Sequence, residues 1–290
     1  MKKAFVQLHI AVFLAGFTGI LGRLITLNEG LLVWWRLLLT AVSMWLVFAL
    51  AKRIHRISAR DKWRIAGVGF IAALHWVSFY GAIKYANVSV ALVCFSSVGF
   101  FTALFEPLLL RRPFVAVELC LGLLAMAGIY IIFHFDARYK TGIVIGVFSA
   151  MLGSVFPVLN RQLLQRMNAE TLMSWEISAG FISLSLVLPL YLHYFPVASL
   201  LPGPHDLFWL LVLSWLCSVW AFQLSANALK KISAFTVNLT YQLEPVYGIA
   251  LAFAVYGENA YLDLSFYAGL FLILLAVVLQ SVRVYTRRAA

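Results

Sequence analysis

Apolar residues fall along this chain in ten separate runs of about 20 residues, divided by short polar segments. A transmembrane helix needs about 20 apolar residues, because each residue adds about 1.5 Å across a hydrocarbon core of about 30 Å. Membrane-spanning strands would instead alternate in polarity over about 10 residues, and these runs do not. The pattern predicts transmembrane helices over residues 4–22, 31–51, 64–84, 88–110, 114–135, 141–163, 171–191, 206–229, 233–256 and 264–284.

The composition excludes a soluble enzyme. Of the 290 residues, 63% are hydrophobic and 11% are charged, whereas about a quarter are charged in a soluble domain. No connection between the runs exceeds 15 residues, too short for a soluble catalytic or nucleotide-binding domain. There is no Gly-rich loop ending in Lys-Ser or Lys-Thr, and the histidines and cysteines lack metal-ligand spacing. We therefore expect no cofactor, no metal and no catalytic residues.

Basic residues gather on one side of the predicted membrane. If the N-terminus is cytoplasmic, seventeen of the 22 Lys and Arg residues fall in cytoplasmic segments: Lys2, Lys3, Lys52, Arg53, Arg56, Arg60, Lys62, Arg64, Arg111, Arg112, Arg161, Arg166, Lys230, Lys231, Arg283, Arg287 and Arg288. This bias predicts cytoplasmic termini. It also accounts for the net charge of +11 as a topology signal beside anionic lipid, so no nucleic-acid partner is expected.

The two halves of the chain resemble each other in the order of their residues. The matched residues are Trp35-Arg36 with Trp175-Glu176, Arg23 with Arg161, Ala82, Val88 and Ser89 with Ala226, Ile232 and Ser233, and Gly122 with Gly269. Five helices per half is an odd number, so the second half enters the membrane from the opposite side. The sequence thus predicts an all-α membrane protein of ten transmembrane helices in two inverted five-helix repeats, residues 1–136 and 137–290.

The chain resembles the EamA family of the drug/metabolite transporter superfamily over nearly its whole length. The features that carry the resemblance are Trp35-Arg36, the stretch from Ala82 to Leu92, its echo from Ala226 to Thr236, Glu244-Pro245-Val246-Tyr247, Tyr256-Gly257-Glu258 and Gly269. The first half departs from the pattern, with Arg111-Arg112-Pro113 where the second has Gly257-Glu258. The resemblance implies a bacterial inner-membrane exporter of small organic metabolites, often amino acids, with a central cavity.

Polar and aromatic residues within the runs are candidates for the wall of such a cavity. A charge at the centre of a bilayer costs at least about 2.5 kcal/mol, so Glu244 is a candidate for a substrate ammonium or a proton. Aromatic and amide side chains lie at similar depth, although such stripes are also typical of packing between helices. The candidate substrate-binding residues are His75, Trp76, Phe79, Tyr80, Ser96, Phe100, Trp215, Gln223, Asn238, Tyr241, Gln242 and Glu244.

Charged residues near the ends of the runs are candidates for gates. On the cytoplasmic side we expect Glu106, Arg161 and Glu176 to form a network, and on the other side Arg36 with Arg23 and Glu29. Static pairing, or snorkelling of long side chains to the interface, is the alternative for residues so placed.

These features favour a secondary transporter in which two halves rock around a midplane cavity that holds an amino acid or another zwitterionic or aromatic metabolite. The alternative is a membrane scaffold or small-molecule sensor, which binds a ligand but moves no solute across a sealed vesicle.

Overall fold

The computed structural model of the chain describes residues 2–135, 137–229, 231, 237, 240–241 and 243–289. These residues form helices, and no strand occurs among them. The elements of the first half are α1 (Lys2–Leu24), α2 (Glu29–Leu50), α3 (Ala59–Tyr85), α4 (Val88–Phe95), α5 (Val98–Leu110) and α6 (Ala116–Phe135). Those that follow are η1 (Ala137–Tyr139), α7 (Lys140–Leu163), α8 (Ala169–Tyr194), α9 (Pro204–Ser214), η2 (Trp215–Trp220), α10 (Ala221–Leu229), α12 (Glu244–Tyr256), η3 (Glu258–Ala260) and α13 (Leu264–Ala289).

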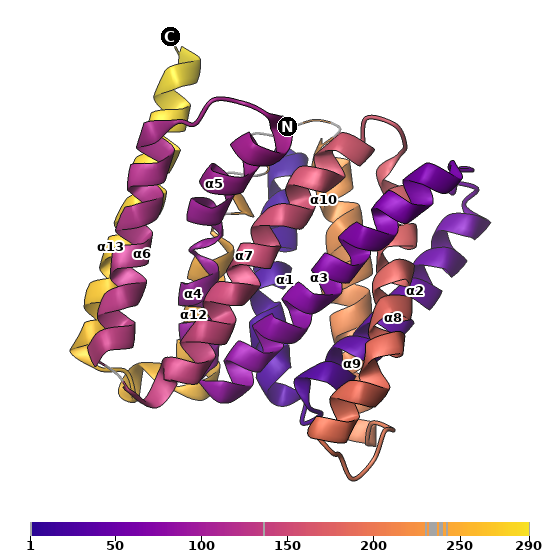
Figure 1. Cartoon of the computed structure of the whole chain (residues 1–290), viewed down its shortest axis with the longest axis horizontal. Helices are drawn as coiled ribbons and strands as arrows, with labels where there is room; N and C mark the ends of the chain where they lie inside the picture. The colour runs from indigo at the N-terminus through magenta and orange to yellow at the C-terminus, as the bar shows by residue number, and fades with distance from the viewer. Residues whose placement is uncertain are drawn as a thin grey trace.

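The helices run side by side between two ends of the bundle (Figure 1). Both termini lie at the top of that view, and we call this end the upper face and the other the lower face. Close packing joins α3 to α7 and α8, α6 to α13, and α1 to α10 and α12. Segments far apart in the sequence therefore lie next to one another throughout the bundle.

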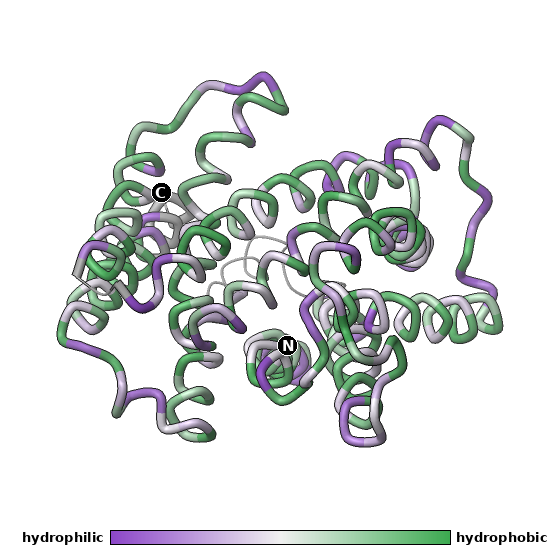
Figure 2. Tube along the Cα trace, turned by 60° about the horizontal axis from the view of Figure 1, so that its bottom comes forward, coloured by the Kyte–Doolittle hydropathy of each residue, from purple (hydrophilic) through white to green (hydrophobic). Residues whose placement is uncertain are grey.

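Helices long and apolar enough to cross a membrane account for most of the chain. Eight such segments occur among the described residues, and Glu244–Tyr256 and Leu264–Gln280 are shorter apolar helices. Hydrophobic residues follow the helices and hydrophilic ones gather mainly at the connections (Figure 2). Large apolar side chains such as Leu186 and Leu264 are 78% and 83% exposed, as expected where lipid is the solvent.

The predicted runs 88–110 and 206–229 are not continuous α-helices. The run 88–110 is interrupted at Ser96 and Ser97, whose hydroxyls donate to the carbonyls of Leu92 and Cys94 at 3.1 Å and 2.7 Å. The run 206–229 contains η2, a π-helix of six residues between α9 and α10. Such irregular backbone within a membrane is confined to segments packed in protein or facing a cavity.

Asparagine caps begin the second helix of each half at matching positions. The Asn28 side chain accepts from the Leu31 amide at 2.8 Å, and Asn168 accepts from the Thr171 amide at 3.3 Å. These two caps stand 140 residues apart, the separation that also relates Trp35 to Trp175. Each cap satisfies a backbone donor that the first turn of a helix leaves free.

Glycines allow three pairs of helices to touch backbone to backbone. A Cβ built on Gly16 would lie 2.8 Å from the Gly248 nitrogen, where α1 crosses α12. A Cβ on Gly180 would lie 2.9 Å from the Gly69 carbonyl oxygen, where α8 crosses α3. Gly128 meets Gly269 in the same way between α6 and α13. Without a hydrophobic force between helices in lipid, such close packing is a main source of association.

We predict that Gly128→Ala destabilises the protein, because its new methyl group would lie 2.5 Å from the Gly269 carbonyl oxygen. The expected loss in free energy of unfolding is about 1–3 kcal/mol, measured by reversible unfolding of the purified protein in detergent. The matched control is Gly67→Ala on α3, where a Cβ would meet nothing within 4 Å. Equal stabilities for the two variants would contradict the close crossing of α6 and α13.

Candidate functional site

A buried arginine lies at the centre of the first group of polar contacts. Arg36 is 7% exposed and lies about 10 Å along α2 from its first residue. Its guanidinium donates to the Tyr80 hydroxyl at 2.9 Å and to Ser218 Oγ at 3.3 Å. The guanidinium carbon also lies 4.8 Å from the centre of the Trp76 ring. Residues from α2, α3 and η2 thus meet around one positive charge.

The π-helix η2 brings two serines to this arginine. Ser218 lies in η2, and its hydroxyl accepts from Arg36 while donating to the Leu213 carbonyl at 3.1 Å. Ser214, one residue before η2, donates from Oγ to the Arg36 carbonyl at 3.3 Å. A π-helix widens the helical turn and is often found at functional sites. The widened turn lets both hydroxyls face the same residue of α2.

The outer network expected from sequence does not form, so that prediction is wrong. Arg23 pairs with Glu258 at 2.7 Å, and Glu29 accepts from the Tyr191 hydroxyl at 2.8 Å. Arg36 instead turns toward Trp76 and Tyr80 in the bundle interior. Depth along a helix, which sequence provides, does not fix the direction in which a side chain leaves it.

Glu244, at the middle of the predicted run 233–256, is the first residue of α12 and does not lie in mid-helix. Pro245 lacks a backbone donor and is therefore favoured in the first turn of a helix, where that donor has no partner. The Glu244 carbonyl lies at the crossing with α1, 2.9 Å from where a Gly16 Cβ would be. Its carboxylate is partly buried and forms no ion pair or side-chain hydrogen bond with another described residue.

His75 is packed in an aromatic cluster. Its ring is 5% exposed and lies 5.5 Å from both the Phe95 and the Phe156 ring centres, with Phe79 at 6.2 Å. Its Nδ1 lies 2.9 Å from both the carbonyl oxygen and the hydroxyl of Ser149 on α7. His75 and Phe79 therefore pack α3 against α4 and α7. These contacts favour the interpretation of the aromatic residues of α3 as packing between helices.

The other predicted wall residues are dispersed. Phe100 packs on Gly122 of α6, and Trp215, 53% exposed, donates to Ser43 Oγ at 2.9 Å. Ser96 lines an apolar cavity of 180 Å³ between α12 and α13.

Tyr241 and Gln223, both expected in the cavity wall, differ in whether they have a hydrogen-bond partner. Tyr241 shares a hydrogen bond of 2.6 Å with the Ser225 hydroxyl. Among the described residues, the Gln223 amide nitrogen has no partner although it is buried. Asn238 and Gln242 lie outside the described residues.

One acidic side chain joins the two halves of the chain at the lower face. Glu258 is 2% exposed, and its carboxylate accepts from Arg23 and from the backbone amides of Val88 and Ser89 at 3.1 Å and 2.8 Å. These amides begin α4, where the helix dipole favours a negative charge. The Arg23 guanidinium also lies 4.2 Å from the centre of the Tyr256 ring. This contact joins α1 and α4 of the first half to η3 of the second.

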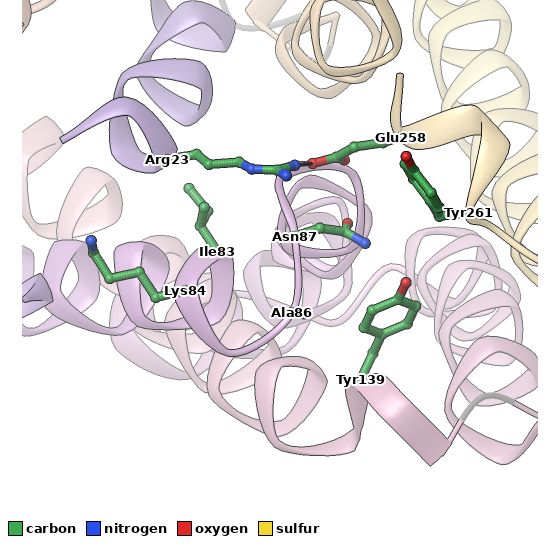
Figure 3. Close-up of a pocket in the computed structure, with 8 residues that line it drawn as sticks. All are labelled: Arg23, Ile83, Lys84, Ala86, Asn87, Tyr139, Glu258 and Tyr261. Atoms are coloured by element: carbon green, nitrogen blue, oxygen red, sulfur yellow. Dashed lines mark hydrogen bonds and ion pairs between the residues drawn. The ribbon is translucent and has the colours of Figure 1, made fainter. Parts of the chain in front are cut away.

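A cavity of 310 Å³ lies against this ion pair on the lower face. Figure 3 shows Arg23 and Glu258 pointing toward each other, with Tyr139 and Tyr261 near the Glu258 end and Lys84 on the other side. Lys84 also lines a neighbouring cavity of 470 Å³ beside Asn28 and Glu29. Two cavities that share Lys84 therefore lie at the lower face, and one of them is lined by the Arg23–Glu258 pair.

The upper face carries a weaker ion pair. Arg161 of α7 lies 3.2 Å from Glu106 of α5, and Arg112 lies 3.8 Å from the same carboxylate. The Arg161 and Glu106 side chains are 63% and 30% exposed, and pairs in such settings contribute about 0–1 kcal/mol. Glu176 does not join them: it is buried and accepts from the Asn160 amide at 2.7 Å. Of the three residues expected to form a network, Arg161 and Glu106 are in contact and Glu176 is not.

Sequence reasoning did not identify Glu258, Ser214 or Ser218 as site residues. Glu258 was visible only as part of a family pattern, and nothing near it in the chain identifies Arg23 as its partner. The serines could be found only with knowledge of the π-helix, which has no sequence signal of its own.

Comparison with known proteins identifies the family. The model of the EamA-like transporter family matches the chain twice, over residues 2–134 and 140–282. No curated protein matches the chain. A solved structure that is 15% identical has the same fold, with a TM-score of 0.63 over 94% of this chain and 95% of its own. Because the family model matches nearly the whole sequence, this multi-pass membrane protein belongs to the EamA-like transporter family.

Proposed function

We propose that the chain is a secondary transporter that exports small organic metabolites, amino acids or other zwitterionic or aromatic compounds, by alternating access. In this proposal ten crossings form two inverted repeats, residues 1–136 and 137–290. The upper face is cytoplasmic in a bacterial inner membrane, because the basic residues gather on that side.

The observation that carries the proposal is a pair of matched arginines at opposite faces. Arg23 and Arg161 correspond in the two halves of the sequence. Arg23 binds Glu258 of the second half at the lower face, and Arg161 binds Glu106 of the first half at the upper face. Each contact joins the two halves, so each must break when the halves separate at that end.

The two contacts differ in strength, as alternating access requires. Glu258 is buried and accepts three hydrogen bonds, whereas Glu106 is partly exposed and contacts only exposed arginines. Hydrogen bonds to a charged group contribute about 1.5–3 kcal/mol each, more than an exposed ion pair. We infer that this conformation is closed at the lower face and that transport opens it there.

Solute movement separates this proposal from the rival of a scaffold or sensor. Purified protein in sealed vesicles, screened for counterflow of radiolabelled metabolites, is expected to exchange at least one of them. Binding without exchange would favour the sensor.

We predict that Glu258→Gln opens the lower face. The change removes the charge that holds Arg23 and the first amides of α4. With Ser89→Cys as a probe in a variant lacking Cys94, Cys120 and Cys217, labelling by an impermeant maleimide from the lower-face side should become about tenfold faster.

The matched control for this prediction is Asp263→Asn, which removes an exposed ion pair with Arg138 at the same face. Labelling of the control should be unchanged. If Glu258→Gln also labels at the parental rate, Glu258 does not close the lower face.

We predict that Glu244→Gln impairs exchange. The substitution keeps the size of the side chain but removes the negative charge available to a substrate ammonium. Counterflow of the metabolite found in the vesicle screen should fall at least about tenfold, the equivalent of one lost charged hydrogen bond. Glu170→Gln, which removes a carboxylate paired with the exposed Arg53, is the control and should exchange normally. Exchange at the parental rate in Glu244→Gln would remove Glu244 from the mechanism.

A further inference from the structure

The Arg36 guanidinium is a buried charge without a counter-ion in contact. Its side chain forms no ion pair with any described carboxylate, although only 7% of the residue is exposed. Ionisable groups within a membrane protein are rare and are usually paired, because an unpaired charge is costly there. Tyr80, Ser218 and Trp76 stabilise Arg36 through hydrogen bonds and a ring face, but none of them neutralises it.

The guanidinium retains unused hydrogen-bond donors. Arginine carries five N–H groups in one plane, and Arg36 uses two of them in side-chain hydrogen bonds with Tyr80 and Ser218. These two bonds and the Trp76 ring hold the plane in one orientation. A fixed guanidinium with free N–H groups matches a carboxylate, which accepts two parallel hydrogen bonds from it.

Glu244 of α12 is a second ionisable group within the bundle that forms no ion pair with Arg36 or with another described basic residue. Two opposite charges left apart, on α2 and α12, suit a ligand that carries both signs, with its carboxylate at Arg36 and its ammonium toward Glu244. The Trp76 ring lies beside the Arg36 end of this arrangement.

We propose that Arg36 determines specificity by binding the carboxylate of the substrate. This assignment rests on the proposed transport function and deepens it, because it requires a substrate with a free carboxylate. It also replaces the gating role that the sequence suggested for Arg36. The substrate carboxylate then neutralises the Arg36 guanidinium, which no described protein carboxylate does.

The experiment compares acids with amines. Binding of L-phenylalanine, L-tryptophan, L-leucine and L-threonine to the purified protein is measured by calorimetry. Each is compared with the amine that lacks only the carboxylate, for example phenethylamine for phenylalanine. The wild type is expected to bind at least one acid about tenfold or more tightly than its amine, because the amine leaves Arg36 unneutralised.

Variants test whether Arg36 is the cause. Arg36→Gln should lose that preference, so that the acid and its amine bind with similar affinity, and Arg36→Lys should restore part of it by restoring the charge. Arg138→Gln, which removes an arginine at the lower surface, should keep the full preference. A purely structural role for Arg36 would weaken the acid and the amine equally.

Clear results would overturn the assignment. It fails if no acid binds the wild type more tightly than its amine, a comparison that needs no variant to fold. It also fails if folded Arg36→Gln keeps the preference. If the wild type prefers the acid but moves none in vesicles, Arg36 still binds the carboxylate, and the transport proposal alone is wrong.

Discussion

The low tolerance of the membrane interior for charge governs the arrangement of this protein. A buried ionised group is retained only when hydrogen bonds, an opposite charge or a ligand compensate for the water it has lost. Glu258 is compensated fully, by Arg23 and two backbone amides. Arg36 is compensated only in part, by two hydroxyls and an aromatic ring. From the first residue we infer that the lower face is closed, and from the second we propose a site for a substrate carboxylate.

Similar ion pairs join the two halves of the chain at opposite ends of the bundle. Matched arginines pair with glutamates of the other half at opposite ends of the bundle. The two ends are unequal, since the second half has Gly257-Glu258 where the first has Arg111-Arg112. Gly257 takes a left-handed conformation, φ 61°, that ends α12 and lets Glu258 reach the first turn of α4. The lower face therefore has an ion pair with a buried carboxylate, whereas the ion pair of the upper face is more exposed.

Sequence predicted what depends on local pattern. The apolar runs predicted the helical membrane fold. Glu106, Arg161 and Glu176 were expected together at one end of the membrane, and of these Arg161 and Glu106 are in contact. The sequence did not predict features that depend on contacts between residues far apart in the chain. The direction of Arg36 depends on Tyr80 and on the π-helix that carries Ser218, and the interruption at Ser96 depends on hydroxyls that bond to the preceding turn. These features depend on tertiary contacts and local backbone geometry, which the pattern of residues along the chain does not predict.

The most direct test of alternating closure is a pair of spin-label distances measured by pulsed electron resonance during exchange. One pair of labels replaces Tyr85 and Tyr261 at the lower face, and the other replaces Leu109 and Leu164, exposed residues on α5 and after α7. The account predicts that addition of the transported metabolite populates a state in which the lower-face distance lengthens as the upper-face distance shortens. Two distances that stay single and unchanged while the protein exchanges solute would contradict it.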